Sequence, residues 1–187
     1  MKIPKKRWVD IVWVALFLII MFTPLGKTIK VFINSVIALS PNVIEQPEAK
    51  VIDNMYWSLE SLATGEVINL ENYKGKVIFI NTWAIWCPPC LAEMPDINTL
   101  YADYKDKVVF LMVTSDHKSA VNQLMHKENY DFINYTMRSS VPNVLSSRSI
   151  PYTSVIDKKG RIRVEKIGAA KWNSTDFRLA LDSMLNE

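Results

Sequence analysis

The sequence has few residues of the kinds that crosslink a small fold or bind a metal. Its 187 residues include two cysteines, Cys87 and Cys90, and two histidines, His117 and His126. A disulfide scaffold needs several widely spaced cysteines, because closing a long loop constrains the unfolded chain most. A structural zinc site needs four ligands, and no second cysteine pair is present. We therefore predict neither a disulfide scaffold nor a metal site.

The chain also lacks a basic excess outside its N-terminus. Its formal net charge is +3, but residues 1–40 hold six Lys or Arg residues against one acid, Asp10. Residues 41–187 carry 16 basic and 18 acidic side chains, so this larger part is mildly acidic. Such a balance gives no electrostatic basis for nucleic-acid binding, and we predict none.

The N-terminus combines a basic start with an apolar run. Residues 8–25 (WVDIVWVALFLIIMFTPL) would span about 27 Å as a helix, close to the ~30 Å hydrocarbon core of a membrane. The preceding basic residues favour an N-in orientation. We expect residues 1–26 to form a basic segment and a single-pass transmembrane anchor in the inner cell membrane, with the domain that follows on the periplasmic or extracytoplasmic side. A cleaved signal peptide and a buried core helix are the alternatives.

Residues 27–54 form the predicted connection between anchor and domain. Residues 27–39 (KTIKVFINSVIAL) are too short to span a membrane, and their pattern fits an amphipathic helix on the membrane surface. Packing on the soluble domain or on another protein is the alternative. Residues 40–53 contain Pro41 and Pro47 and are interpreted as a tether.

Residues 55–187 show the alternating strand and helix patterns of an α/β domain. Two continuous apolar runs are typical of strands buried on both faces, and a turn links the last two strands into an edge hairpin. The predicted strands are 57–62, 66–70, 77–83, 108–113, 135–138, 152–156 and 161–167. The predicted helices are 91–104, with a kink at Pro95, then 118–129, a short one at 141–147, and a last one to residue 185 that begins at Asn173 or Ser174.

The two cysteines lie three residues apart at the junction of a strand and a helix. The run 77–83 delivers Cys87 to the first turn of the following helix, where free backbone N–H groups and the helix dipole favour a thiolate. Cys90 lies one turn later and can attack a mixed disulfide formed at Cys87. We therefore predict that Cys87 is the exposed nucleophile and Cys90 the resolving thiol. Their redox-active disulfide would need no other cofactor.

Three motifs resemble the thioredoxin superfamily, and most closely its TlpA/ResA-type membrane-anchored thiol–disulfide oxidoreductases. They are residues 83–90 (WAIWCPPC), residues 93–95 (EMP) and Ile150-Pro151. The resemblance covers about residues 55–187. It implies a thioredoxin-like fold with a central mixed β-sheet flanked by helices and an N-terminal transmembrane helix. It also implies substrate-binding or supporting roles for Trp86, Pro88, Pro89, Ile150 and Pro151.

The resemblance further implies a cis Pro151 that faces Cys87. A cis proline turns the chain and leaves the backbone of Ile150 free to pair with an extended substrate. Thioredoxins carry a buried Asp where this chain has Asn81. Glu93, one turn after Cys90, matches the acid of TlpA/ResA-type proteins and would take the Cys90 proton or tune its pKa. A solvated helix carboxylate is the alternative for Glu93.

The two prolines between the cysteines affect the thiolate. If Cys87 is the N-cap, its sulfur accepts from the second or third helical N–H. Pro89 removes the second, which leaves the Cys90 N–H as the principal local donor. We therefore predict a Cys87 pKa in the upper part of the roughly 3.5–7.5 range of activated thiols. A weakly stabilised thiolate predicts a weak oxidant, which favours reduction or isomerisation.

These features predict a thiol–disulfide oxidoreductase that reduces protein disulfides outside the cytoplasm. Its partners would be protein disulfide or dithiol substrates and a membrane electron-donor thiol protein. The resemblance makes cytochrome c maturation one plausible pathway. Residues 114–149 resemble this group's central insertion and would contact the partner. A DsbA-like oxidant or isomerase is one alternative. A Sco-like copper-delivery module is another, although it expects three residues between its cysteines and a partner His.

Overall fold

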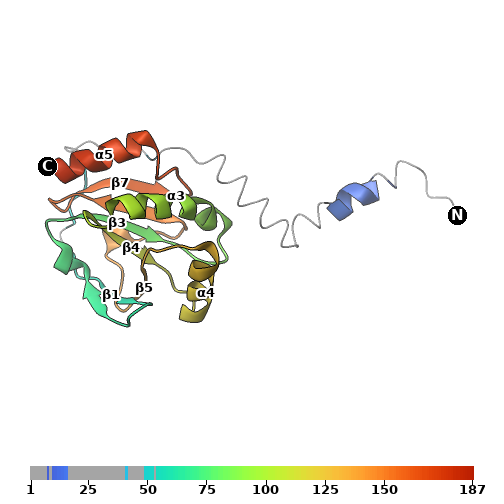
Figure 1. Cartoon of the computed structure of the whole chain (residues 1–187), viewed down its shortest axis with the longest axis horizontal. Helices are drawn as coiled ribbons and strands as arrows, with labels where there is room; N and C mark the ends of the chain where they lie inside the picture. Colours follow the sequence, from blue (N-terminus) through green and yellow to red (C-terminus); the bar gives the residue numbers. More distant parts are fainter. Residues whose placement is uncertain (1–7, 9, 17–40, 42–48, 53) are drawn as a thin grey trace.

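The N-terminal part of the chain is described only in fragments. The computed structural model describes Trp8, residues 10–16, Pro41, residues 49–52 and residues 54–187. Residues 10–16 are helical (Figure 1). The rest of the predicted anchor, all of the predicted amphipathic helix and most of the tether lie outside the described residues. Within the described ranges, no helix is both long enough and apolar enough to cross a membrane.

The domain contains seven strands, three α-helices and two 3-10 turns among its described residues. The strands are β1 (Ser58–Ser61), β2 (Val67–Asn69), β3 (Val77–Thr82), β4 (Val108–Val113), β5 (Asn134–Met137), β6 (Tyr152–Ile156) and β7 (Ile162–Ile167). The helices are α3 (Pro88–Tyr104), α4 (Lys118–Glu128) and α5 (Thr175–Asn186), and the 3-10 turns are η2 (Leu70–Tyr73) and η3 (Asn143–Leu145).

The strands form one mixed sheet in the order β2-β1-β5-β4-β3-β6-β7. β3 runs parallel to β4, and β4 runs parallel to β5, whereas the remaining neighbours are antiparallel. The expected mixed sheet is confirmed, and so is the hairpin β6–β7, with β7 at an edge. Because Thr82 pairs with Tyr152, the end of β3 and the start of β6 meet at one end of the sheet.

The central strand β3 is buried on both faces, as its continuous apolar sequence predicts. Side chains alternate between the faces of a strand. Val77 and Phe79 accordingly belong to one hydrophobic cluster, and Ile78 and Ile80 to the other. The strand therefore contributes side chains to both hydrophobic clusters. Its pairing with β4 and β6 fixes the start of the segment that leads to Cys87.

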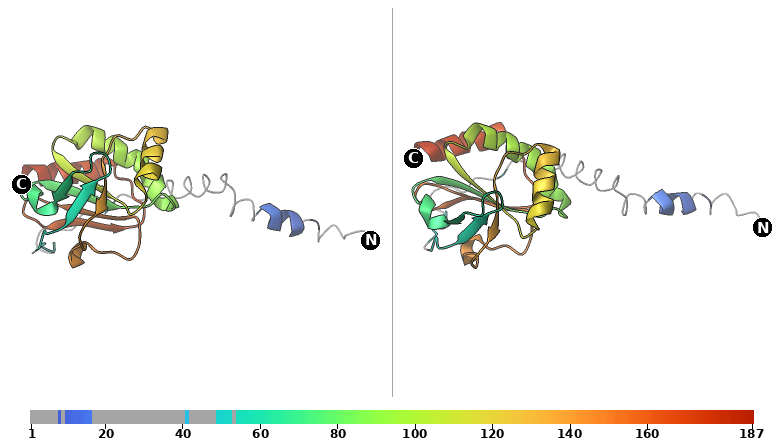
Figure 2. Two further views of the ribbon diagram at one scale, coloured as in Figure 1. Left: turned by 90° about the horizontal axis from the view of Figure 1, so that it is seen from below. Right: turned by 60° about the horizontal axis from the view of Figure 1, so that its bottom comes forward.

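All three α-helices pack on one face of the sheet. Side chains of α3, α4 and α5 share one cluster with Phe79, and Figures 1 and 2 show α3 and α5 side by side along the sheet. β3, β4 and β5 step across the sheet in one direction, so right-handed crossovers place α3 and α4 on the same side. Trp172 and Phe177 pack edge-on against Phe79, with ring centroids 5.2 and 6.3 Å away.

The other face is covered by short turns and an extended segment. Its cluster includes Trp57, Leu70 of η2 and Leu145 of η3. Ile52 is also buried there, and its N–H donates to the Gly160 carbonyl at 2.9 Å. The expectation of helices flanking the sheet therefore holds fully for one face, while the second is covered by the 3-10 turns and by Ile52, Met55 and Trp57.

Two helices differ in extent from their predicted ranges. α3 begins at Pro88 instead of residue 91, because proline is well suited to the first helical position, where its missing N–H costs nothing. Pro95 lies inside α3 without ending it. The short helix expected at 141–147 is reduced to η3. Ser174 caps α5, with its hydroxyl accepting from the Phe177 N–H at 3.4 Å.

Candidate active site

The two cysteines form a disulfide at the N-terminus of α3. Their Sγ atoms are 2.10 Å apart and their Cα atoms 5.3 Å apart. Cys87 is the N-cap of α3, with extended backbone, and its Sγ accepts from the Cys90 N–H at 3.3 Å. This single local donor is the one that the sequence predicted. Pro88 and Pro89 occupy the first two helical positions and offer no N–H to the sulfur.

Both cysteines are buried in this oxidised state. Cys87 is 3% exposed and Cys90 1% exposed. The prediction of an exposed Cys87 is therefore wrong for the disulfide form, because the residue packs in the cluster that includes Ala84 and Met94. Trp86 is 71% exposed, so the residue just before the pair projects into solvent.

The loop between β3 and α3 is held by three polar side chains. The Trp83 Nε1–H donates to the Asn134 Oδ1 at 3.1 Å. The Ile85 N–H donates to the Asp116 Oδ2 at 2.7 Å, and the Thr114 hydroxyl donates to the same oxygen at 3.0 Å. These contacts hold the segment that leads into Cys87. Asp116 was not predicted as a site residue, although its position just after the buried strand 108–113 was a signal for it.

The peptide bond between Ile150 and Pro151 is cis, as the resemblance implied. Pro151 immediately precedes Tyr152, which pairs with Thr82 at the end of β3. Cys87 follows that same strand end. Ile150 also packs against the cluster that contains both cysteines. The Ile150-Pro151 segment and the disulfide therefore lie at the same end of the sheet.

Glu93 is the buried acid of the site, with 2% of its surface exposed. Its Oε1 accepts from the Asn81 Nδ2 at 2.8 Å. Its Oε2 accepts from the Trp172 Nε1 at 2.7 Å and from the Ala170 N–H at 3.1 Å. The alternative of a solvated helix carboxylate is therefore wrong.

The environment of Glu93 raises its pKa from 4.5 to about 7. Burial is the largest cause, because it penalises the charged form. The hydrogen bonds from Trp172, Asn81 and Ala170 oppose this rise, and the charge of Asp96 on the same helix adds to it. A carboxyl with a pKa near neutrality can accept and release a proton under ordinary conditions.

Most of the hydrogen-bond partners of Glu93 were not predicted from the sequence. Asn81 was noted only as a replacement for an acid, and Thr153, Ala170 and Trp172 were not singled out. Trp172 is fully buried although it follows an edge strand. A tryptophan in the sequence AAKWNS was a signal of a buried residue. Its partner Glu93 could not be predicted, because it lies 79 residues away along the chain.

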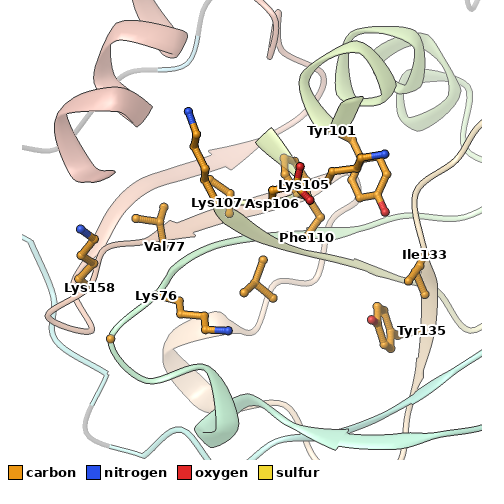
Figure 3. A pocket seen from close by; sticks show the side chains of 13 residues that line it. Lys76, Val77, Tyr101, Lys105, Asp106, Lys107, Phe110, Ile133, Tyr135 and Lys158 are labelled. Carbon is orange, nitrogen blue, oxygen red and sulfur yellow. The ribbon is translucent and has the colours of Figure 1, made fainter. Parts of the chain in front are cut away.

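A hollow of about 370 Å³ lies at the opposite end of the sheet. It is lined near the starts of β3 and β4 by Lys76, Lys105, Lys107 and Lys158, among others. In Figure 3 Lys76 points across the hollow, whereas Lys107 and Lys158 point away from it. The ammonium groups therefore do not converge on one point, and the hollow has no part in the chemistry of the cysteines.

Comparison with known proteins places the chain in a family. The model of the Redoxin family matches residues 46–181, which include the disulfide, Glu93 and Pro151. The chain belongs to the redoxin family. This redoxin is 32% identical over 130 residues to the thioredoxin-like protein YneN of Bacillus subtilis, covering 67% of this chain and 76% of that protein. It is 33% identical over 106 residues to the thiol-disulfide oxidoreductase ResA of Bacillus cereus, covering 55% of this chain and 61% of that protein.

Solved structures support the same fold. A DsbF homologue from Corynebacterium diphtheriae superposes with a TM-score of 0.61 at 18% identity, covering 77% of this chain and 92% of that one. At that identity the match shows the thioredoxin-like fold alone. The family and the sequence relatives together identify this redoxin as a thiol–disulfide oxidoreductase.

Proposed function

We propose that this redoxin is a ResA-type reductant of protein disulfides that acts outside the cytoplasm. The observation that carries the proposal is the Cys87–Cys90 disulfide, which caps α3 beside a buried acid of raised pKa. The basic and apolar N-terminal sequence supports the location. Cytochrome c maturation is one pathway that such a reductant would serve.

The reaction begins with both cysteines reduced. The Cys87 thiolate attacks one sulfur of a substrate disulfide, so a mixed disulfide forms and the other substrate sulfur leaves as a thiolate. The Cys90 thiol then loses its proton and attacks the Cys87 sulfur. A Cys87–Cys90 bond forms, the mixed disulfide breaks and the second substrate thiolate leaves. Two electrons have then passed to the substrate, and a membrane thiol protein supplies two more to reduce the Cys87–Cys90 disulfide.

Glu93 serves as the acceptor for the Cys90 proton in this scheme. The two residues lie three apart on α3, so their side chains share one face of the helix. Both are buried, which limits the access of solvent bases to the thiol. A carboxyl of pKa about 7 can take a proton from a thiol near neutral pH and release it after the substrate has left.

The substrate would bind across the exposed Trp86 and the Ile150-Pro151 segment. Trp86 supplies apolar contact area, and the Ile150 backbone would pair with an extended substrate strand. Pro88 and Pro89 would support this surface from the first turn of α3. Residues 114–149 would contact the partner. Their η3 part adjoins the same end of the sheet, because Leu145 and Ser146 line a hollow together with Thr82 and Tyr152.

A trapping experiment tests this function. A Cys90→Ala variant keeps the nucleophile but cannot resolve the mixed disulfide, so it should accumulate substrate proteins bonded to Cys87 in its native membrane. Non-reducing electrophoresis followed by mass spectrometry identifies them. The Cys87→Ala variant and the double variant are the controls and should capture none.

Capture of disulfide-bonded proteins that lie outside the cytoplasm supports thiol–disulfide exchange with such substrates through Cys87. The reduction potential of the Cys87–Cys90 pair then decides between a reductant and a DsbA-like oxidant. Equal capture by Cys87→Ala would assign the nucleophile to Cys90. No captured protein with any variant would contradict the proposed function.

A further inference from the structure

Glu93 is surrounded by hydrogen-bond donors of two different kinds. The Ala170 N–H and the Trp172 Nε1–H, both bonded to Oε2, can only donate. The Asn81 Nδ2, bonded to Oε1, belongs to an amide that also carries an acceptor oxygen. Oε2 therefore cannot carry a proton without giving up at least one of its two bonds. When Glu93 is neutral, the better place for the proton is Oε1, which accepts a single bond and faces Asn81.

The amide of Asn81 has an unused acceptor for that proton. Its Nδ2 donates to the Glu93 Oε1 and also to the Thr153 Oγ1, each at 2.8 Å. Its Oδ1 is buried and has no hydrogen-bond partner among the described residues. This orientation suits a charged Glu93. A half-turn of the amide would bring Oδ1 to face both the protonated Oε1 and the Thr153 hydroxyl, which can donate as well as accept.

We propose that Asn81 and Thr153 form a hydrogen-bond relay whose direction reverses when Glu93 gains or loses its proton. With Glu93 charged, the Asn81 amide donates to Glu93 and to Thr153. With Glu93 neutral, the amide is reversed and accepts from both. Asn81 and Thr153 are thus positioning residues that set the proton affinity of Glu93. The inference rests on the proposed role of Glu93 as the acceptor for the Cys90 proton.

The fold restricts the change to these two side chains. Asn81 and Thr153 are paired across β3 and β6, both are buried, and their backbones are held by the sheet. The groups that face Glu93 from the segment after β7 are the neutral donors of Ala170 and Trp172. Asp96, on α3 itself, is the charged side chain that acts on Glu93 through space. Among the described residues, the Coulombic contribution to the Glu93 pKa therefore comes from α3 and not from β3 or β6.

Carboxyl titration by NMR tests the relay. The full chain is prepared in detergent micelles, oxidised and labelled with ¹³C at its glutamate carboxyls, and the Glu93 signal is followed against pH. Thr153→Val removes the acceptor of one Asn81 N–H in the charged state, while in the neutral state the Asn81 Oδ1 keeps its bond from Glu93. The variant should therefore raise the midpoint by about one pH unit.

Thr153→Ser is the matched control because it keeps the hydroxyl. Its midpoint should stay within a few tenths of a pH unit of the wild-type value. A midpoint unchanged in Thr153→Val would overturn the relay. A shift in Thr153→Ser as large as that in Thr153→Val would also overturn it, since the effect would then come from packing and not from the hydroxyl.

The reversal itself has a separate readout. The nuclear Overhauser contact between the Asn81 side-chain NH₂ and Thr153 should weaken as Glu93 is protonated, with the same midpoint as the carboxyl signal. In Glu93→Gln the side-chain NH₂ at position 93 can only donate to Asn81, so the contact should stay weak at every pH. A contact that is strong and unchanged across the titration of the wild type would contradict the reversal.

Failure of the relay and failure of the proposed function are distinguishable. These titrations are made on oxidised protein without turnover, so they do not depend on catalysis. If Glu93→Gln leaves the pH dependence of substrate reduction unchanged, the catalytic role of Glu93 is wrong, whatever the amide of Asn81 does.

Discussion

At the scale of single residues, Glu93 is the side chain whose environment departs most from its place in the sequence. A glutamate in the second turn of a helix is ordinarily solvated. Here the carboxyl is buried and accepts three hydrogen bonds from two separate parts of the chain, β3 and the segment after β7. The motif EMP located the residue, but periodicity could not show that Trp172 and Ala170 cover it, because they are distant in sequence.

The raised pKa of Glu93 makes stability depend on pH. Between pH 4.5 and about 7, the carboxyl ionises in the unfolded chain but keeps its proton in the folded one. The folded state therefore loses stability as pH rises through this range, by about 3 kcal/mol for a shift of this size. Glu93→Gln cannot ionise. We expect it to gain stability relative to the wild type over the same interval, as measured by urea unfolding of the full chain in detergent.

Glu128→Gln provides the control for that measurement. Glu128 lies at the C-terminal end of α4, and its ion pair with Lys127 is exposed. Its substitution should leave the pH dependence as in the wild type. A stability difference between Glu93→Gln and the wild type that stays constant from pH 4.5 to 8 would contradict the raised pKa.

At the scale of elements, the first turn of α3 determines how strongly the Cys87 thiolate is stabilised. The sulfur accepts from the Cys90 N–H, while Pro89 at the second helical position has no N–H to offer. A thiolate with one local donor is a moderate leaving group, which makes the disulfide a weak oxidant. The Cys-Pro-Pro-Cys sequence therefore biases the helix end toward reduction.

A substitution in this turn tests the effect of the missing Pro89 N–H on the Cys87 thiolate. Pro89→Ala restores the missing N–H and should lower the Cys87 pKa by about one unit, because a hydrogen bond to a charged group favours the charged form. The pH dependence of alkylation by iodoacetamide, measured on the reduced Cys90→Ala background, gives that pKa. Pro88→Ala is the matched control and should change it less, since the first helical N–H is not the one that a capping side chain bonds. A wild-type midpoint below about 4.5, or equal shifts in the two variants, would contradict the argument.

The elements differ in how far their sequences determine them. β3 and β4 carry continuous apolar runs, so they were predicted within one residue of their observed ends. The covering of the second face was not predicted, because Ile52, Met55 and Leu145 of η3 are brought there by contacts with residues distant in sequence. The disulfide, Trp86 and Ile150-Pro151 could be located from the sequence because each lies in a short local motif. The hydrogen bonds of Glu93 could not, because their donors are distant in sequence.

At the scale of the whole molecule, the predicted membrane topology determines where the disulfide works. The basic residues before the apolar run predict that the domain lies outside the cytoplasm. A membrane-impermeant maleimide should then label Cys87 in intact cells after mild reduction, using the Cys90→Ala variant. A cytoplasmic protein with an accessible cysteine is the control and should be labelled only after lysis. Labelling of Cys87 only after lysis would contradict the topology.

The central claim is that Cys87 and Cys90 form a two-electron couple that reduces protein disulfides. Equilibration of the full chain with glutathione redox buffers, read from the fraction of free thiols by mass spectrometry, measures its reduction potential directly. The single local donor to Cys87 predicts a transition of two electrons at about −200 mV or lower. A potential near −120 mV, as in strong oxidants, or the absence of a two-electron transition would contradict the account.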